Sequence, residues 1–260
     1  MKFYIRGGIG DLLQHYSFIK ENLGKQYLVH MHFKNVKQIF DEIGALNCLF
    51  YGFEDFDSLK KQTDAIVNQV VNTDKENICE TPRVFYSDFN FGDKPNFKAQ
   101  ELISSFKIKK NIIGIHPFGS NFANSLYESL HLPTKFISVD IVKEIVNINN
   151  NYLIFGSKKE LSSYGLHESE NIKFVCFENI LHSLSVIKYC STLIGTDSCF
   201  KSMSSMQKIK TICIIGDFED PIRDSYFIKK YEEDKIMKVF KTKNTIEDKD
   251  KIVEFIKYNI

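Results

Sequence analysis

Residues 181–198 read LHSLSVIKYCSTLIGTDS and hold the most specific pattern in this chain. Apolar residues at helical spacing cover 180–189, an apolar strand follows at 192–195, and a second helical stretch runs over 198–207. Asp197 and Ser198 stand where this strand gives way to the helix, so backbone N–H groups and the Ser198 hydroxyl could cradle a phosphate there. Asp197 would fix the turn rather than touch the anion. The alternative is that the two residues only cap the helix.

Strand-length apolar runs alternate with helix-period stretches on both sides of this segment, which is typical of α/β construction with parallel sheets. In the second half, further strands are expected at 112–116, 152–155, 172–177, 211–216 and 236–240, and further helices at 135–148 and 247–258. In the first half, strands are expected at 3–5, 27–31 and 46–51, with two more near 65–71 and 83–86, and helices at 11–23, 36–43 and 97–106. Each half opens with a strand, a glycine turn and a helix, so the sequence predicts two Rossmann-like domains, 1–108 and 109–260.

The glycine turn of the first half ends on an aspartate. Gly8 and Gly10 precede Asp11, and glycines at such a turn let the backbone approach an anion at the helix N-terminus. The segment has neither the G-x-G-x-x-G of dinucleotide-binding proteins nor the Gly-Lys-Ser/Thr of a P-loop. Asp11 can be interpreted in two ways. It either stabilises the helix from its first turn, by about 0.5–2 kcal/mol, or acts as a general base at the rim of a cleft.

Two more glycine turns follow expected strands of the second half. Ligands of open α/β sheets bind at the carboxyl ends of the strands, so small polar residues there are candidates for phosphate contact or are parts of an ordinary loop. The candidates after the strand at 112–116 are Gly119, Ser120 and Asn121. His116 beside them is expected to be a packed histidine rather than a catalyst. After the strand at 152–155, Gly156 ends the strand and Glu160 either reaches a ribose hydroxyl pair or lies on the solvated surface.

Composition narrows the class of protein further. The net charge of +1 argues against a protein that coats itself in nucleic acid, and no apolar run is long enough to span a membrane. The N-terminus does not resemble a signal peptide, so a cytoplasmic location is expected. The six cysteines lack metal-ligand spacing and are expected to be buried free thiols. Lysine is strongly preferred over arginine, as in AT-rich genes of low-GC bacteria and their phages.

Five segments, in order, resemble the glycosyltransferase family that contains the bacterial ADP-heptose:lipopolysaccharide heptosyltransferases. They are IGDLL at 9–13, IHPFGS at 115–120, LIFGSKKE at 153–160, the quoted block at 181–198, and TICIIGD at 211–217. The resemblance implies the GT-B architecture, with two Rossmann-like doubly wound domains facing a central cleft. It also implies transfer of a sugar from a nucleotide diphosphate sugar to an acceptor hydroxyl, without metal or cofactor.

The same resemblance assigns roles to individual residues. Asp11 would be the general base, the Asp197–Ser198 turn and Ser120 would hold the donor diphosphate, and Glu160 would bind the ribose. This sequence departs from the family after Ser198: Cys199 stands where the family has glycine, and Ser202 where it has histidine. Lys201 could replace the lost positive charge. The chain also has no tryptophan, whereas the family has a lysine-x-tryptophan-proline segment.

The sequence is compatible with several functions. The expected acceptor is a surface glycan, with a protein as a second choice. A phage enzyme could instead glycosylate hydroxymethylated pyrimidines in DNA, in the host cytoplasm, with a lysine-rich rim as the DNA contact. The candidates for that rim are Lys107, Lys109, Lys110, Lys158, Lys159 and Lys201. The chain could also be an inactive nucleotide-binding relic of a GT-B enzyme. A sugar-nucleotide epimerase would need more ionisable residues near the glycine turns.

Overall fold

The computed structural model describes residues 2–7, 9–31, 35–52, 78–80, 83–106, 111–119, 136–146, 150–176, 178–216 and 226–260. The chain divides into two compact units, Met1–Ser87 with Asn179–Leu181, and Asp88–Glu178 with His182–Ile260. The sequence placed this boundary near residue 108. Helix α4 (Asp93–Ser104) belongs with the second unit. There Ser185 Oγ donates to the Pro95 carbonyl at 3.0 Å, and Lys188 Nζ donates to Asn96 Oδ1 at 2.6 Å.

The first unit is built on a parallel sheet with the strand order β3-β2-β1-β4. The strands are β1 (Lys2–Gly7), β2 (Gln26–Met31), β3 (Cys48–Gly52) and β4 (Ile78–Glu80), and the described helices are α1 (Ile9–Glu21) and α2 (Asn35–Ile43). Helix α1 buries one apolar stripe, in which Leu13, Tyr16 and Ile19 recur at helical spacing. This stripe holds the helix, and with it Asp11, in place.

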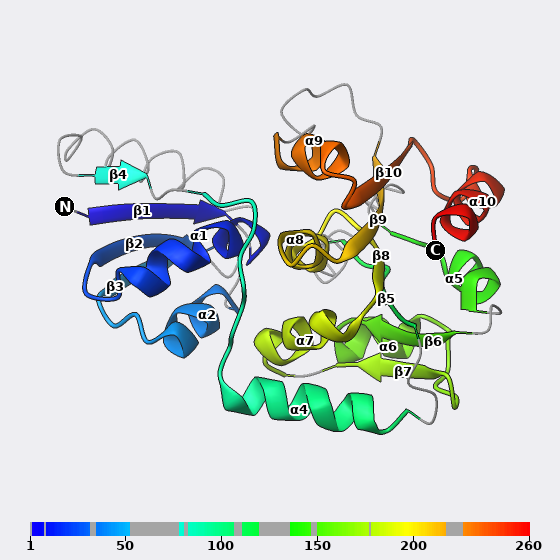
Figure 1. The fold of residues 1–260 in the computed structure, drawn as a ribbon, viewed down its shortest axis with the longest axis horizontal. Coiled ribbons are helices and arrows are strands. Elements are labelled where there is room, and N and C mark those ends of the chain that lie inside the picture. Colours follow the sequence, from blue (N-terminus) through cyan, green and yellow to red (C-terminus); the bar gives the residue numbers. More distant parts are fainter. Residues whose placement is uncertain are drawn as a thin grey trace. The chain divides into compact units, whose positions relative to one another are not determined.

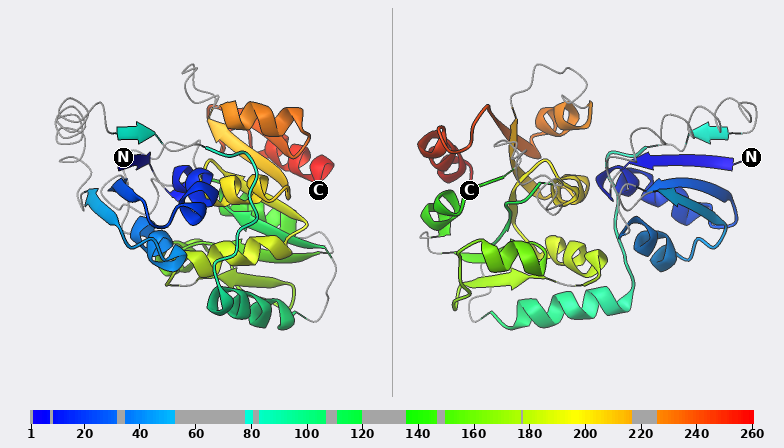
Figure 2. Two further views of the ribbon diagram at one scale, coloured as in Figure 1. Left: turned by 60° about the vertical axis from the view of Figure 1, so that its left-hand side comes forward. Right: turned by 180° about the vertical axis from the view of Figure 1, so that it is seen from behind.

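The second unit is built on a parallel sheet with the strand order β10-β9-β8-β5-β6-β7. Its strands are β5 (Ile112–His116), β6 (Asn151–Phe155), β7 (Ile172–Val175), β8 (Thr192–Thr196), β9 (Lys210–Gly216) and β10 (Met237–Thr242). Besides α4, its helices are α5 (Val139–Val146), α6 (Lys158–Ser163), α7 (Ile180–Val186), the 3₁₀ turn η2 (Ile187–Tyr189), α8 (Cys199–Met206), α9 (Tyr226–Glu233) and α10 (Lys249–Asn259). Helices α7 and α8 lie on one face of this sheet and α5 and α10 on the other (Figures 1 and 2).

The order of these strands fixes where a ligand crevice can form. The chain passes from β5 outward to β6 and β7, then returns and passes from β8 outward in the other direction to β9 and β10. The switch therefore lies between β5 and β8, and open α/β sheets bind ligands outside the carboxyl ends of the strands at such a point. The α/β class and the parallel sheet that the sequence predicted are confirmed.

The three strands β5, β6 and β8 are buried along their whole length, as expected for parallel strands covered by helices on both faces. Their side chains form the core with α5 and α10. Within the described part of the chain, no helix is both long and apolar enough to cross a membrane.

Some elements differ from the sequence prediction. The strand expected at 83–86 is wrong, because this segment has no strand structure and Val84 N–H donates to the carbonyl of Gln14 in α1 at 2.9 Å. The strand expected near 65–71 lies outside the described residues. Strand β4 and the short helices α6 and α9 were not predicted.

Gly114 tests the packing between β5 and β8. A Cβ at this position would lie 2.8 Å from Leu193 Cδ1 and 3.0 Å from Phe155 Cε2, closer than carbon atoms pack. We expect Gly114→Ala to lower the free energy of unfolding by about 1–3 kcal/mol, the usual effect of overpacking a core. Urea unfolding measures this. Gly24→Ala is the control, because a Cβ there meets nothing within 4 Å, and equal unfolding midpoints for the two variants would contradict the described packing.

Candidate functional site

The candidate site lies at the carboxyl ends of β5 and β8, the switch point of the six-stranded sheet. These strands are neighbours, and His116 at the end of β5 pairs in register with Gly195 of β8. A Cβ on Gly195 would lie 3.1 Å from the His116 carbonyl oxygen, so glycine permits the close approach of the two backbones. The side chains that follow both strands are therefore brought to one edge.

Ser198 begins helix α8 as its N-cap. Its backbone is extended, with φ −151° and ψ 171°, and its Oγ accepts a hydrogen bond from Lys201 N–H at 3.5 Å. Ser202 Oγ in turn donates to the Ser198 carbonyl at 3.4 Å. The capping role predicted for Ser198 is confirmed. The phosphate role remains a prediction, which the position of this helix N-terminus at the switch point favours.

Cys199 occupies the first position of α8, where the resembling family has glycine. Burial raises the pKa of its thiol to about 12, while the N–H groups of Cys199 and Phe200 act in the opposite direction because they lie beside the sulfur. The side chain is therefore a neutral thiol at neutral pH and adds no negative charge to the turn. A glycine at this position would leave the same N–H groups without a side chain beside them.

Asp197 and Lys201 form an ion pair next to this turn. Lys201 Nζ lies 2.6 Å from Asp197 Oδ1, and the lysine side chain is 9% exposed whereas the aspartate side chain is 48% exposed. The ammonium therefore offsets a carboxylate that would otherwise repel an anion at the start of α8. Lys201 is not a rim lysine, so this part of the DNA-contact expectation is wrong. Lys158 and Lys159 are exposed, and Lys107, Lys109 and Lys110 lie outside the described residues.

We expect Asp197→Asn to destabilise the protein by about 2 kcal/mol, because it removes the carboxylate that lies 2.6 Å from a buried ammonium. The effect should fall below that of a fully buried pair, since Asp197 is half exposed. Asp41→Asn is the matched control. It breaks an ion pair of the same spacing and length, Lys37–Asp41 at 2.7 Å, whose side chains are both more than half exposed. Such a pair contributes about 0.2–0.5 kcal/mol. If chemical unfolding showed the same loss of unfolding free energy in both variants, burial of Lys201 would not make its pair with Asp197 more stabilising than an exposed one.

His116 is packed, as the sequence predicted, and it also contacts the turn. The residue is 8% exposed, and its ring stacks on Phe200 with centroids 4.1 Å apart and an interplanar angle of 25°. Its Nδ1 lies 3.0 Å from Ser198 Oγ. Burial lowers the pKa of His116 from 6.5 to about 3, so the imidazole is neutral at neutral pH. Sequence reasoning missed the contact with Ser198, which depends on β5 and β8 being neighbours.

Glu160 and Gly156 have structural roles of their own at the neighbouring strand end. Glu160 forms a capping box with Ser157: Ser157 N–H donates to Glu160 Oε2 at 2.7 Å, and Glu160 N–H donates to Ser157 Oγ at 3.3 Å. Glu160 is buried, so the alternative of a solvated surface glutamate is wrong. A Cβ on Gly156 would lie 2.8 Å from Phe118 Cε2, which explains this glycine by packing.

The remaining donor-site candidates of the second unit follow β5 in the sequence. Gly119 is buried, and Ser120 and Asn121 lie outside the described residues. A phosphate role for Gly119 and a ribose role for Glu160 therefore stay predictions.

Asp11 stands in the first turn of α1 in the other unit. Helix α1 begins at Ile9, so Gly10 is its second residue rather than part of the turn, and Gly8 lies outside the described residues. The Asp11 side chain is 45% exposed, and Arg83 Nη1 lies 3.9 Å from its Oδ1. The same Arg83 Nη1 donates to Gln14 Oε1 at 3.3 Å. Arg83 was not predicted to be near Asp11, because the segment that contains it was expected to be a strand.

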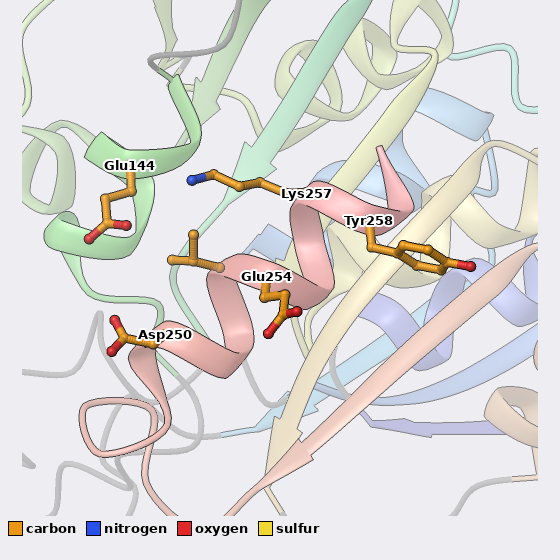
Figure 3. Close-up of a pocket in the computed structure, with 6 residues that line it drawn as sticks. Glu144, Asp250, Glu254, Lys257 and Tyr258 are labelled. Carbon is orange, nitrogen blue, oxygen red and sulfur yellow. The ribbon is translucent and has the colours of Figure 1, made fainter.

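Helices α5 and α10 border an open hollow of about 490 Å³ elsewhere on the second unit. Figure 3 shows its lining, formed by Glu144, Asp250, Val253, Glu254, Lys257 and Tyr258. The hollow includes no strand-end turn. Glu144 pairs with Lys249 at 2.6 Å, which lowers the pKa of its carboxyl through the hydrogen bond.

Among the described residues, no group of three or more His, Cys, Asp or Glu side chains is arranged to hold a metal ion. Cys48, Cys176, Cys190, Cys199 and Cys213 are free thiols. The expected burial is confirmed for Cys190 and Cys213, whereas Cys48 and Cys199 are half-buried. Cys176, which directly follows the last residue of β7, is exposed, so the expectation is wrong there.

Comparison with known proteins identifies solved structures with a similar fold. Two solved structures are similar over nearly the whole chain. A glycosyl transferase family 9 protein from Veillonella parvula aligns with 11% identity and a TM-score of 0.57, covering 100% of this chain and 89% of its own. The E. coli ADP-heptose LPS heptosyltransferase II aligns with 10% identity and a TM-score of 0.58, covering 99% and 97%. The chain shares its fold with these glycosyltransferases. This confirms, at the level of the fold, the resemblance drawn from the sequence. No family model and no curated protein matches the sequence.

Proposed function

We propose that the chain is a glycosyltransferase of the GT-B kind, which moves a sugar from a nucleoside diphosphate sugar to an acceptor hydroxyl. The observation that carries the proposal is the Ser198 turn, a helix N-terminus at the switch point of a parallel sheet, in a fold shared with solved glycosyltransferases. Helix N-termini at this place in a sheet are suited to phosphate groups. The second unit is therefore assigned to the donor, and the first unit to the acceptor.

In the proposed reaction, the acceptor oxygen attacks the anomeric carbon of the donor sugar while the bond from that carbon to the phosphate oxygen breaks. The electron pair of the broken bond leaves with the nucleoside diphosphate, and the Asp11 carboxylate takes the proton of the acceptor hydroxyl. The proton moves late, as the anomeric carbon gains positive charge, so an ordinary carboxylate is a sufficient base.

The charge that develops on the leaving diphosphate is offset by the second unit. The N–H groups at the start of α8 and the Ser198 hydroxyl are fixed donors, and fixed donors stabilise such charge without reorganising. The Asp197–Lys201 pair has no net charge. The Asp197 carboxylate therefore does not oppose the binding of the diphosphate. We propose that no metal takes part, so transfer should persist in excess EDTA.

A panel of UDP-, GDP- and ADP-sugars tests the proposal. One of them is expected to raise the melting temperature and to be slowly hydrolysed, or transferred to an added glycan acceptor. Stabilisation by nucleoside diphosphates without any turnover would instead support an inactive relic, which Cys199 beside the α8 N–H groups favours. Cys199→Gly is then expected to tighten binding without restoring turnover. No stabilisation and no turnover with any donor would overturn both readings.

The proposed acceptor is a surface glycan. The alternative of hydroxymethylated DNA has less support, since Lys201 is buried, although Lys158 and Lys159 are exposed. Salt separates the two acceptors, because contacts to DNA phosphates weaken steeply as salt rises. Activity that does not change between low and moderate salt would argue against DNA.

A further inference from the structure

We infer that His116 is a positioning residue, which donates a hydrogen bond from Nδ1 to Ser198 Oγ and thereby turns the Ser198 hydroxyl hydrogen toward the bound diphosphate. The inference rests on the proposed function and deepens it, since it names the group that orients the donor-binding hydroxyl. The observation that motivates it is the distance of 3.0 Å between His116 Nδ1 and Ser198 Oγ across the switch point.

Counting hydrogens at Ser198 shows what each direction of this bond leaves for a ligand. A serine hydroxyl has one hydrogen to donate and two lone pairs that accept. Lys201 N–H already takes one lone pair. If His116 carries its hydrogen on Nδ1, it takes the second lone pair, and the hydroxyl hydrogen is left for a ligand. If Nδ1 is bare, the hydroxyl must donate to the ring and has no hydrogen left for a ligand.

Phosphate oxygens only accept hydrogen bonds from such a site, so only the first arrangement makes Ser198 useful to a diphosphate. The imidazole has a single N–H hydrogen, on either Nδ1 or Nε2, because burial lowers the pKa of His116 to about 3 and keeps the ring neutral. The choice between the two arrangements is therefore a choice of tautomer.

The surroundings hold the ring in the orientation that this bond needs. Phe200 stacks on one side of the imidazole, and Phe118 meets it edge-on with centroids 6.2 Å apart. Phe155 packs behind Phe200 at 5.1 Å between centroids. A ring clamped in this way orients the hydroxyl before any ligand arrives, which is how polar groups gain strength in a binding site.

The tautomer can be measured directly on the wild-type protein. ¹⁵N-histidine labelling and long-range ¹H–¹⁵N correlation at neutral pH distinguish a protonated from a bare Nδ1, and the spectrum of His116→Asn assigns the signal. A protonated Nδ1 is expected. A bare Nδ1 in both the free protein and its complex with a nucleoside diphosphate would overturn the inference.

Binding measurements test the consequence. The probe is the nucleoside diphosphate, among UDP, GDP and ADP, that stabilises the wild type most, and calorimetry gives its Kd. His116→Phe keeps an aromatic ring but has no donor, and it should weaken binding about tenfold, as Ser198→Ala should. His116→Asn can offer its side-chain N–H and should bind within about threefold of wild type.

A double-mutant cycle separates positioning from general damage to the site. In the Ser198→Ala background, His116→Phe should cause no further loss of affinity. Wild-type affinity in His116→Phe, or full additivity of the two losses, would overturn the inference and leave the proposed function intact. A wild type that binds none of the three nucleotides would overturn the proposed function and, with it, the inference. If His116→Phe does not fold, the inference is still tested by the tautomer of His116 in the wild type and by the Kd of His116→Asn.

Discussion

Replacing Asp11 by asparagine is expected to slow sugar transfer by about 10²–10⁴-fold, the usual contribution of a general base. Asparagine has nearly the same shape as aspartate but cannot take the proton of the acceptor hydroxyl. The loss should appear in kcat at saturating donor. The Kd of the nucleoside diphosphate should not change, because the proposed donor residues belong to the other unit.

Stability measurements separate this role from that of a helix-stabilising carboxylate. Asp11 stands in the first turn of α1, where a negative charge favours the helix by about 0.3–1 kcal/mol. If that were its whole role, Asp11→Asn would lower the melting temperature slightly and leave turnover as in the wild type. Asp41→Asn, an exposed position in the same unit, is the control for charge removal and should leave the rate unchanged.

The second large effect concerns stability at acidic pH. We expect His116 to make the free energy of unfolding fall by about 3 kcal/mol between about pH 6.5 and pH 4. Burial lowers the pKa of His116 from 6.5 to about 3. Between these values the unfolded chain binds a proton that the folded protein does not, so stability rises with pH. The contribution is fully present above pH 6.5 and is lost as the pH falls toward 3.

The wild type alone cannot isolate this contribution, because carboxylates also titrate below pH 5. The quantity to compare is therefore the difference in unfolding free energy between wild type and His116→Phe, measured by urea unfolding from pH 7 to pH 4. Phenylalanine keeps an aromatic ring against Phe200 and cannot be protonated. Parallel pH curves for the two proteins would show that His116 is not held neutral by burial.

The sequence predicted the elements whose signal is local and long enough to show a period. Strand β8, the turn at Ser198 and helix α8 were all expected within a residue or two of where they stand. Helix α6 was missed because it is short and polar, although Ser157 and Glu160 have the spacing of a capping box and could have revealed its start. Arg83 to Tyr86 have strand-like residues, but Val84 N–H donates to the Gln14 carbonyl of helix α1 instead of pairing in a sheet.

The candidate site was predicted only where its residues are close in the sequence. One local motif contains Asp197, Ser198 and Lys201, and its strand-to-helix turn was predicted. His116 lies far from Ser198 along the chain, and the two meet because β5 is the neighbour of β8, an order that periodicity does not give. The contact of Arg83 with Gln14 is hidden for the same reason. Long-range contacts depend on topology, which local patterns do not encode.

We propose, above all, that a donor diphosphate binds at the switch point between β5 and β8. Crystals soaked separately with UDP-, GDP- and ADP-sugars test it most directly. We expect diphosphate oxygens within hydrogen-bond distance of Ser198 Oγ and of the N–H groups that open α8. A nucleotide bound with its phosphates away from the carboxyl ends of these two strands would contradict it.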